Sequence, residues 1–96
     1  MRAYEVVYVL TPDLEEEQVE EKHNEFKSVI ERYGGAPGEI DVWGKRRLAY
    51  EIDDYQEGIY ALRKFQGENQ VLTELERSLK MDESILRYLI ARDEDA

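Results

Sequence analysis

With 96 residues, the chain is long enough for one small domain with a single modest core, and too short for a catalytic cleft between domains. It carries 23 acidic and 13 basic residues, and its formal net charge of −10 ordinarily disfavours binding to nucleic acid. The chain has no cysteine, which excludes disulfides, thiolate zinc sites and a cysteine nucleophile. It shows no stretch typical of a signal peptide or a membrane span, so we expect a cytoplasmic protein.

The first predicted elements are a strand and a helix. Residues 3–10, "AYEVVYVL", are β-branched and aromatic and apolar on both faces, which predicts a strand in the middle of a sheet. The segment "TPDLEEE" then opens a helix, with Thr11 or Asp13 as its cap. Apolar residues recur at helical spacing as far as Tyr33, and two glycines at 34–35 end the helix.

A long hairpin follows in the predicted order of elements. Residues 39–52 alternate with a period of two, and Gly44 in their middle indicates a bulge or bend. The segment "DDYQEG" at 53–58 predicts a turn, and residues 59–65, "IYALRKF", predict the returning strand.

The remaining residues predict a second helix and a last strand. Asn69 is a suitable helix cap, and the apolar stripe continues to Leu79. Residues 85–91, "ILRYLIA", predict the final strand, and residues 93–96 form a short acidic tail. Residues 1–92 are thus expected to fold as a single domain.

This order of elements predicts an α+β fold. Two right-handed βαβ crossovers give a ferredoxin-like β-α-β-β-α-β sandwich, a four-stranded antiparallel sheet with both helices on one face and the first and third strands central. The predicted core consists of Val6, Tyr8, Leu10, Phe26, Ile30, Leu48, Tyr60, Leu62, Leu75, Leu79, Tyr88 and Ile90.

The second face of the predicted sheet has no covering element. An apolar set that continues across several strands favours a protein partner on this face, although a merely solvated aliphatic face is the alternative. Alternation along the strands places the following candidate partner-binding residues on it: Val7, Val9, Trp43, Ile59, Ala61, Arg63 and Leu89.

No constellation of residues predicts catalysis, a metal site or a cofactor. His23 is the only histidine and lies in the apolar stripe of the first helix, so a packed helix residue is a better interpretation than a zinc ligand. The glutamates at the start of that helix predict a hydrated acidic face, since calcium needs a loop of alternating oxygen ligands. The glycine-rich loops that cradle phosphate are also missing. We therefore expect a protein that is not an enzyme.

Three adjacent cations stand out in this acidic chain. Lys45, Arg46 and Arg47 lie in a predicted strand, where neighbouring positions point to opposite faces. A solvated strand end is one interpretation, but arginine is suited to bidentate contact with phosphate, which favours the backbone of folded RNA. Four further cations on other strands are expected to join this patch: Arg2, Arg63, Arg87 and Arg92. Base stacking on the central strands is not expected, because "GIYALRKFQ" lacks the Gly- and Phe-rich signature of RNA-recognition sheets.

The sequence resembles a known family. "WGKRRLAYEI" and "GIYALRKF", with "MRAYEVVYVLTPDL" at the start and "YGG" after the first helix, are similar to ribosomal protein S-six, the sixth protein of the bacterial small ribosomal subunit. The resemblance covers residues 1 to about 92. It implies the same ferredoxin-like fold, binding to the central domain of small-subunit ribosomal RNA, and a heterodimer with the eighteenth small-subunit protein, a small basic chain.

The resemblance also implies roles for individual residues. Matched positions are Arg2, Tyr4, Glu5, Gly44, Arg46, Arg47, Leu48, Ala49, Tyr50, Gly58 and Arg87. Together with the other cations, they give these candidate RNA-binding residues: Arg2, Lys45, Arg46, Arg47, Tyr50, Arg87 and Arg92.

Two other classes of protein share this order of elements. One is a ferredoxin-like small-molecule regulatory or protein-interaction module. The other is a small acylphosphatase-like enzyme, which needs an arginine in the loop after the first strand. Here that loop reads "TPDLEEE", which repels phosphate.

Overall fold

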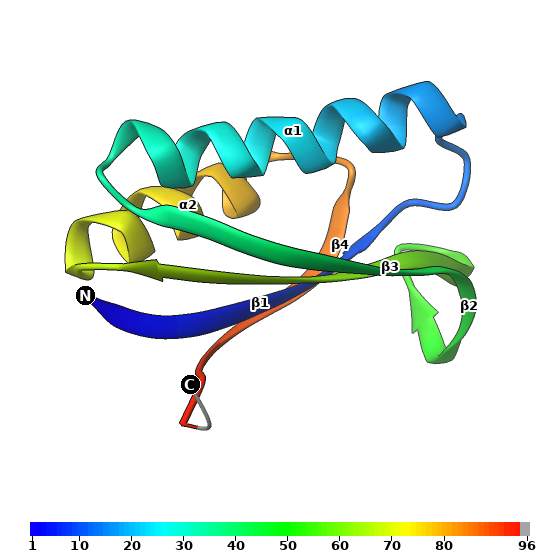
Figure 1. Cartoon of the computed structure of the whole chain (residues 1–96). Coiled ribbons are helices and arrows are strands. Elements are labelled where there is room, and N and C mark those ends of the chain that lie inside the picture. Colours follow the sequence, from blue (N-terminus) through cyan, green and yellow to red (C-terminus); the bar gives the residue numbers. More distant parts are fainter. Residues whose placement is uncertain (95–96) are drawn as a thin grey trace.

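Four strands form one antiparallel sheet, and two helices lie across one of its faces (Figure 1). This computed structural model describes residues 1–94. The elements in chain order are β1 (Arg2–Leu10), α1 (Glu16–Arg32), β2 (Ala36–Ile52), β3 (Tyr55–Gly67), α2 (Asn69–Met81) and β4 (Ile85–Arg92). The strand order is β2-β3-β1-β4, so the predicted fold, with the first and third strands central, is confirmed.

The β2–β3 hairpin is longer than predicted, because its turn is much shorter. Asp53 and Asp54 alone connect the strands, and Ile52 pairs with Tyr55. Both aspartates have positive φ, 50° and 69°, as a two-residue type I′ turn requires. Aspartate tolerates this conformation better than most residues, so the rest of the predicted turn continues the ladder as the beginning of β3.

The starts of the two helices differ slightly from the prediction. Helix α1 begins at Glu16, and the backbone N–H of its cap, Glu15, donates to the side-chain oxygen of Gln18 at 2.9 Å. Neither Thr11 nor Asp13 is the cap, because both lie before Glu15. The N–H of Thr11 donates to the carbonyl oxygen of Ser84 at 2.9 Å. Asn69 is the first residue of α2, one position after the cap.

The main core fills the space between the helices and the sheet. Seven predicted core residues are buried there: Val6, Tyr8, Leu10, Phe26, Ile30, Leu75 and Leu79. Tyr88 and Ile90 are partly buried and pack against this core, as β4 lies at the edge of the sheet. Tyr4 and Phe65 belong to it as well, with their rings stacked at 5.7 Å between centroids.

The prediction assigned β3 to the wrong faces of the sheet. Ile59, Ala61 and Arg63 were expected on the uncovered face, but all three are buried on the helix side. Tyr60 and Leu62 were expected in the core, but they are half-buried and lie on the uncovered side. Both faces of this strand carry apolar residues, so alternation alone cannot distinguish them. The pairing with β1 does, because it sets Ala61 beside the buried Tyr8 and Arg63 beside Val6.

The prediction that Leu48 belongs to the main core is also wrong. It is 8% exposed, but it lies on the uncovered side of the sheet, where it packs with Val9 around Gly58. A Cβ atom on Gly58 would lie only 2.3 Å from Cγ1 of Val9, so glycine is the residue that allows this close approach. These residues form a second, smaller apolar cluster at the hairpin end of the sheet.

The C-terminal strand is anchored further than predicted. The backbone N–H of Asp93 donates to the carbonyl oxygen of Ala3 at 2.9 Å, and its carboxylate lies 3.7 Å from Nζ of Lys64. Asp93 therefore continues the sheet edge instead of starting the expected tail. The last two residues of that tail, 95 and 96, lie outside the described residues.

Asp82 links the end of α2 to α1, and we expect its contribution to stability to depend on pH. Burial would raise the pKa of its carboxyl, but hydrogen bonds from Lys22 and Ser84 outweigh burial and hold the pKa below its ordinary value. Lys22 Nζ lies 2.9 Å from Asp82 Oδ2. Asp82→Asn should therefore lower the free energy of unfolding by about 1–2 kcal/mol at pH 7. Because the pKa of Asp82 is lower in the folded protein than in the unfolded chain, its charge stabilises the fold above about pH 4. The difference in stability between the two proteins should therefore disappear as the pH falls from about 4 through the lower folded-state pKa of Asp82.

Urea denaturation of both chains at pH 7 and at acidic pH measures this difference. Glu25→Gln is the matched control, because Glu25 also contacts Lys22, at 3.2 Å, but is more exposed. It should cost no more than about 0.5 kcal/mol. A loss for Asp82→Asn that is equal at both pH values would show that the charge of Asp82 is not what stabilises this corner.

Candidate nucleic-acid and protein interfaces

A bulge at Gly44 determines where the three cations point. Val42 pairs with Ala61 and Gly44 with Tyr60, so Trp43 is one residue more than β3 can match. Gly44 has a φ of 78°, a conformation that favours glycine, and the predicted bulge is confirmed. The extra residue reverses the alternation of side chains along the rest of β2.

After the bulge, the cations occupy both sides of an edge strand. Arg46, opposite Gly58, lies on the uncovered side of the sheet, and its neighbours Lys45 and Arg47 lie on the helix side. All three are exposed, and within residues 1–94 none has an ion-pair partner. Arg46 Nε donates to the carbonyl oxygen of Trp43 at 3.1 Å, which fixes the direction of its guanidinium. Lys45 shares a hollow with acidic Glu16 and other α1 residues, so it is the least suited to phosphate.

The other predicted cations do not join a single patch. Arg2 lies opposite Gly67 at one end of β3, and Arg46 lies opposite Gly58 near the other. At about 3.3 Å per residue, the two arginines are roughly 30 Å apart. Arg92 lies at the Arg2 end of the sheet. These cations therefore form two separate groups. Arg2 and Arg92 lie at one end of the sheet, and the denser group, Lys45 to Arg47, follows the bulge at Gly44.

Tyr50 and Arg87, both expected to bind RNA, contact each other. Arg87 Nη1 donates to the Tyr50 hydroxyl oxygen at 3.0 Å, and its guanidinium carbon lies 5.8 Å from the centroid of the Tyr50 ring. Tyr50 is on β2 and Arg87 is on β4, the two opposite edges of the sheet. This contact is possible because the far end of the hairpin bends to the side away from the helices (Figure 1). Nothing in the sequence pattern indicates it.

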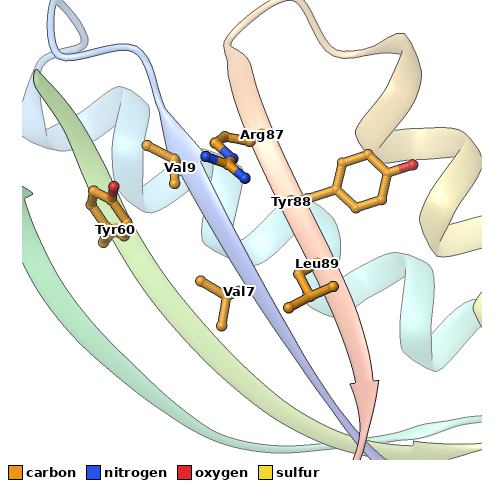
Figure 2. A pocket seen from close by; sticks show the side chains of 6 residues that line it. All are labelled: Val7, Val9, Tyr60, Arg87, Tyr88 and Leu89. Carbon is orange, nitrogen blue, oxygen red and sulfur yellow. The ribbon is translucent and has the colours of Figure 1, made fainter. Parts of the chain in front are cut away.

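The uncovered face contains a shallow apolar cavity of about 300 Å³ (Figure 2). Its lining residues are Val7, Val9, Tyr60, Arg87, Tyr88 and Leu89. Leu89 is 65% exposed, whereas Val9 is only 3% exposed because the hairpin end packs over it. Figure 2 shows Val7, Val9, Tyr60 and Leu89 on this face, while Tyr88 extends towards α2.

Trp43 extends this apolar surface towards the cations. Its ring stacks on Tyr60 with 6.0 Å between the centroids and 18° between the planes. Its indole Nε1 donates to Asp41 Oδ2 at 2.9 Å. Of the predicted partner residues, the structure brings Val7, Trp43 and Leu89 together on an accessible surface, and it adds Tyr60 and Leu62, which the alternation argument had assigned to the core.

The single histidine is a packed residue of α1, as expected. His23 is 5% exposed, and its Nδ1 lies 2.5 Å from the Tyr8 hydroxyl. Burial lowers the pKa of His23, an effect that Glu20 opposes and Arg63 reinforces. Burial also raises the pKa of Tyr8. Within residues 1–94, no three His, Cys, Asp or Glu side chains are grouped to hold a metal ion, and no helix is long and apolar enough to cross a membrane.

Comparisons with known proteins agree with this fold. The family model described as Ribosomal protein S6 matches residues 3–92. The small ribosomal subunit protein bS6 of Syntrophomonas wolfei is 48% identical over 96 residues, covering 99% of each chain. That of Desulfitobacterium hafniense is 46% identical over 95 residues, covering 99% of this chain and 100% of the other.

The fold matches a solved structure equally well. The crystal structure of 30S ribosomal protein S6 from Thermotoga maritima has a TM-score of 0.92 and 32% sequence identity, covering 98% of this chain and 89% of the other. Sequence and fold thus agree over nearly the whole length. The chain belongs to the ribosomal protein S6 family, which consists of structural proteins of the bacterial small ribosomal subunit in the cytoplasm.

Proposed function

We propose that the chain binds the central domain of small-subunit ribosomal RNA through the β2–β3 hairpin, as a heterodimer with the eighteenth small-subunit protein. The proposal rests on the family and on one observation above all. In a chain with a net charge of −10, three adjacent cations on an edge strand have no ion-pair partner among the described residues. Their charge is therefore available to an external anion.

The geometry of the hairpin suits contact with an RNA backbone. Arg46 and Arg47 point to opposite sides of the same exposed strand, so they reach phosphates on either side of it. Such contacts orient a protein on folded RNA without reading its sequence. Screening limits each charge to about 8 Å at physiological salt, so the charges next to the hairpin matter more at the point of contact than the net charge of the chain.

The uncovered face suits a protein partner with basic character. Val7, Trp43 and Leu89 form an accessible apolar surface together with Tyr60 and Leu62. Contiguous apolar surface of this kind is typical of interaction sites. A small basic chain seated there would bury this surface and offset the acidic charge of the complex.

Replacing Arg46 and Arg47 with alanine should weaken RNA binding strongly and make it less sensitive to salt. Each phosphate contact that is lost should lower the slope of log affinity against log salt by about one unit. Because both side chains are exposed, the free energy of unfolding should change by only about 0–1 kcal/mol. Titration of small-subunit ribosomal RNA with the heterodimer at several salt concentrations measures both the affinity and the slope.

A double variant of the same net charge provides the control. Arg32→Ala with Arg77→Ala also removes two exposed arginines, but these belong to the helices α1 and α2 and not to the hairpin. It should leave the slope almost unchanged. Equal slopes for all three proteins would remove the hairpin arginines from the RNA interface and defeat the proposed function.

A further inference from the structure

We infer that Tyr50 and Arg87 form a clasp that positions the cationic end of the hairpin and transmits partner binding to the RNA site. The inference rests on the proposed function, since it assumes both binding surfaces. It assigns the two residues, which were expected to touch RNA, to a positioning role.

The hairpin end depends on side-chain contacts as well as on strand pairing. Regular pairing between β2 and β3 is interrupted between Arg47 and Ile52, so the intervening residues lack the continuous ladder that stabilises the rest of the hairpin. Leu48 is buried against Val9, and Tyr50 receives the hydrogen bond from Arg87. These two contacts help to hold the segment that directly follows the cations, together with the hydrogen bond from Gln56 Nε2 to Glu51 Oε1 at 3.2 Å. When they loosen, the part of β2 that carries Arg46 and Arg47 is held less firmly, by its pairing with β3 and by the hydrogen bond from Arg46 Nε to the carbonyl oxygen of Trp43.

Arg87 belongs to both surfaces. It lines the apolar cavity of the uncovered face together with Val7 and Leu89 (Figure 2). It also donates to the Tyr50 hydroxyl oxygen. Any partner seated in that cavity contacts Arg87 or covers it. Arg87 therefore connects the cavity to the RNA-binding segment by a polar contact, beside the apolar packing of Val9 and Leu48 around Gly58.

Exposure makes this connection sensitive to the partner. Tyr50 is 63% exposed and Arg87 is exposed, so water competes for their hydrogen bond in the free chain. A partner on the cavity excludes this water and strengthens the bond, because electrostatic contacts are stronger at low dielectric. The clasp closes more tightly, the two arginines keep their direction, and RNA binds with a smaller ordering cost. Linkage then requires RNA to tighten the partner contact by the same factor.

Tyr50→Phe tests the clasp, because it removes the hydroxyl acceptor and keeps the ring. The measured quantity is the coupling factor, the ratio of RNA affinities with and without the eighteenth protein. We expect Tyr50→Phe to lower it roughly two- to tenfold, the effect of one lost hydrogen bond. Tyr55→Phe is the matched control, since Tyr55 lies in the same hairpin but donates to Asp13 at 3.2 Å. It should leave the coupling factor unchanged.

Amide hydrogen exchange gives a readout that does not depend on RNA. In the wild type, the partner should slow exchange at positions 48–51, and in Tyr50→Phe this protection should be weaker. The inference is overturned if Tyr50→Phe keeps the wild-type coupling factor, or if it weakens RNA binding equally with and without the partner, as a direct RNA contact would. If Arg46→Ala with Arg47→Ala still weakens RNA binding in that case, the proposed function stands and only the clasp is wrong. If that double variant binds RNA normally, the proposed function fails as well.

Discussion

Addition of the basic partner should tighten binding of the chain to small-subunit ribosomal RNA by about 10- to 100-fold at physiological salt, a coupling within the usual range for linked sites. The isolated chain approaches RNA with a net charge of −10, and its few available cations offset only part of this repulsion. A basic chain seated on the uncovered face, as proposed above, would supply the missing positive charge and would bury exposed side chains such as Leu89.

RNA titration with and without the eighteenth protein measures this effect. An unrelated basic protein of similar size and charge is the control, because it tests whether neutralisation without docking is sufficient; it should tighten binding far less. Equal affinities in both arms, or tight binding by this chain alone, would contradict the heterodimer and favour an independent RNA-binding module.

Shortening Leu75 to alanine should lower the free energy of unfolding by about 2–5 kcal/mol, the usual cost of a large cavity in a packed core. Leu75 has no exposed surface and lies on α2 within the main core. A domain of this size has a total stability of only about 5–10 kcal/mol, so the variant should be close to unfolding at moderate temperature. Urea denaturation followed by circular dichroism measures the loss.

Two further leucines make this experiment specific to position. Leu89→Ala is the same chemical change at a side chain that is 65% exposed, and it should cost less than about 0.5 kcal/mol. Leu48→Ala lies between the two, because it opens the small cluster around Gly58 but leaves the main core intact. A Leu75 variant as stable as the Leu89 variant would show that α2 does not pack on the sheet as described.

The sequence predicted the order of elements and most of the core, because these depend on strong local signals. The helical spacing of Phe26 and Ile30 allows only one buried face, and the bulge at Gly44 follows from a glycine in an alternating strand. Strand β3 gave no such signal. Both of its faces are apolar, so only its pairing with β1, which is remote in sequence, decides that Ala61 is buried and Tyr60 is not.

The sequence predicted the exposure of the candidate site's hairpin cations but not the arrangement of the site. The three hairpin cations were identified correctly as an exposed group on two sides of a strand. Arg2 was placed with them because both lie in strands, yet position along a strand separates residues by much more than strand order does. The contact between Tyr50 and Arg87 depends on the bend of the hairpin end, a tertiary feature that no local pattern encodes.

The position of β1 in the sheet has a consequence for the order of events during synthesis. The first strand to leave the ribosome is also a central one, and both of its neighbours, β3 and β4, come later in the chain. β2 and β3 are joined by a two-residue turn, so they can pair within microseconds of their emergence. β1, apolar along most of its length, must stay unpaired until this hairpin is complete, and its second edge until the last strand is made. Because β1 stays unpaired for longest, it is the segment of the nascent chain most exposed to mispairing. We expect a chaperone to bind this segment first.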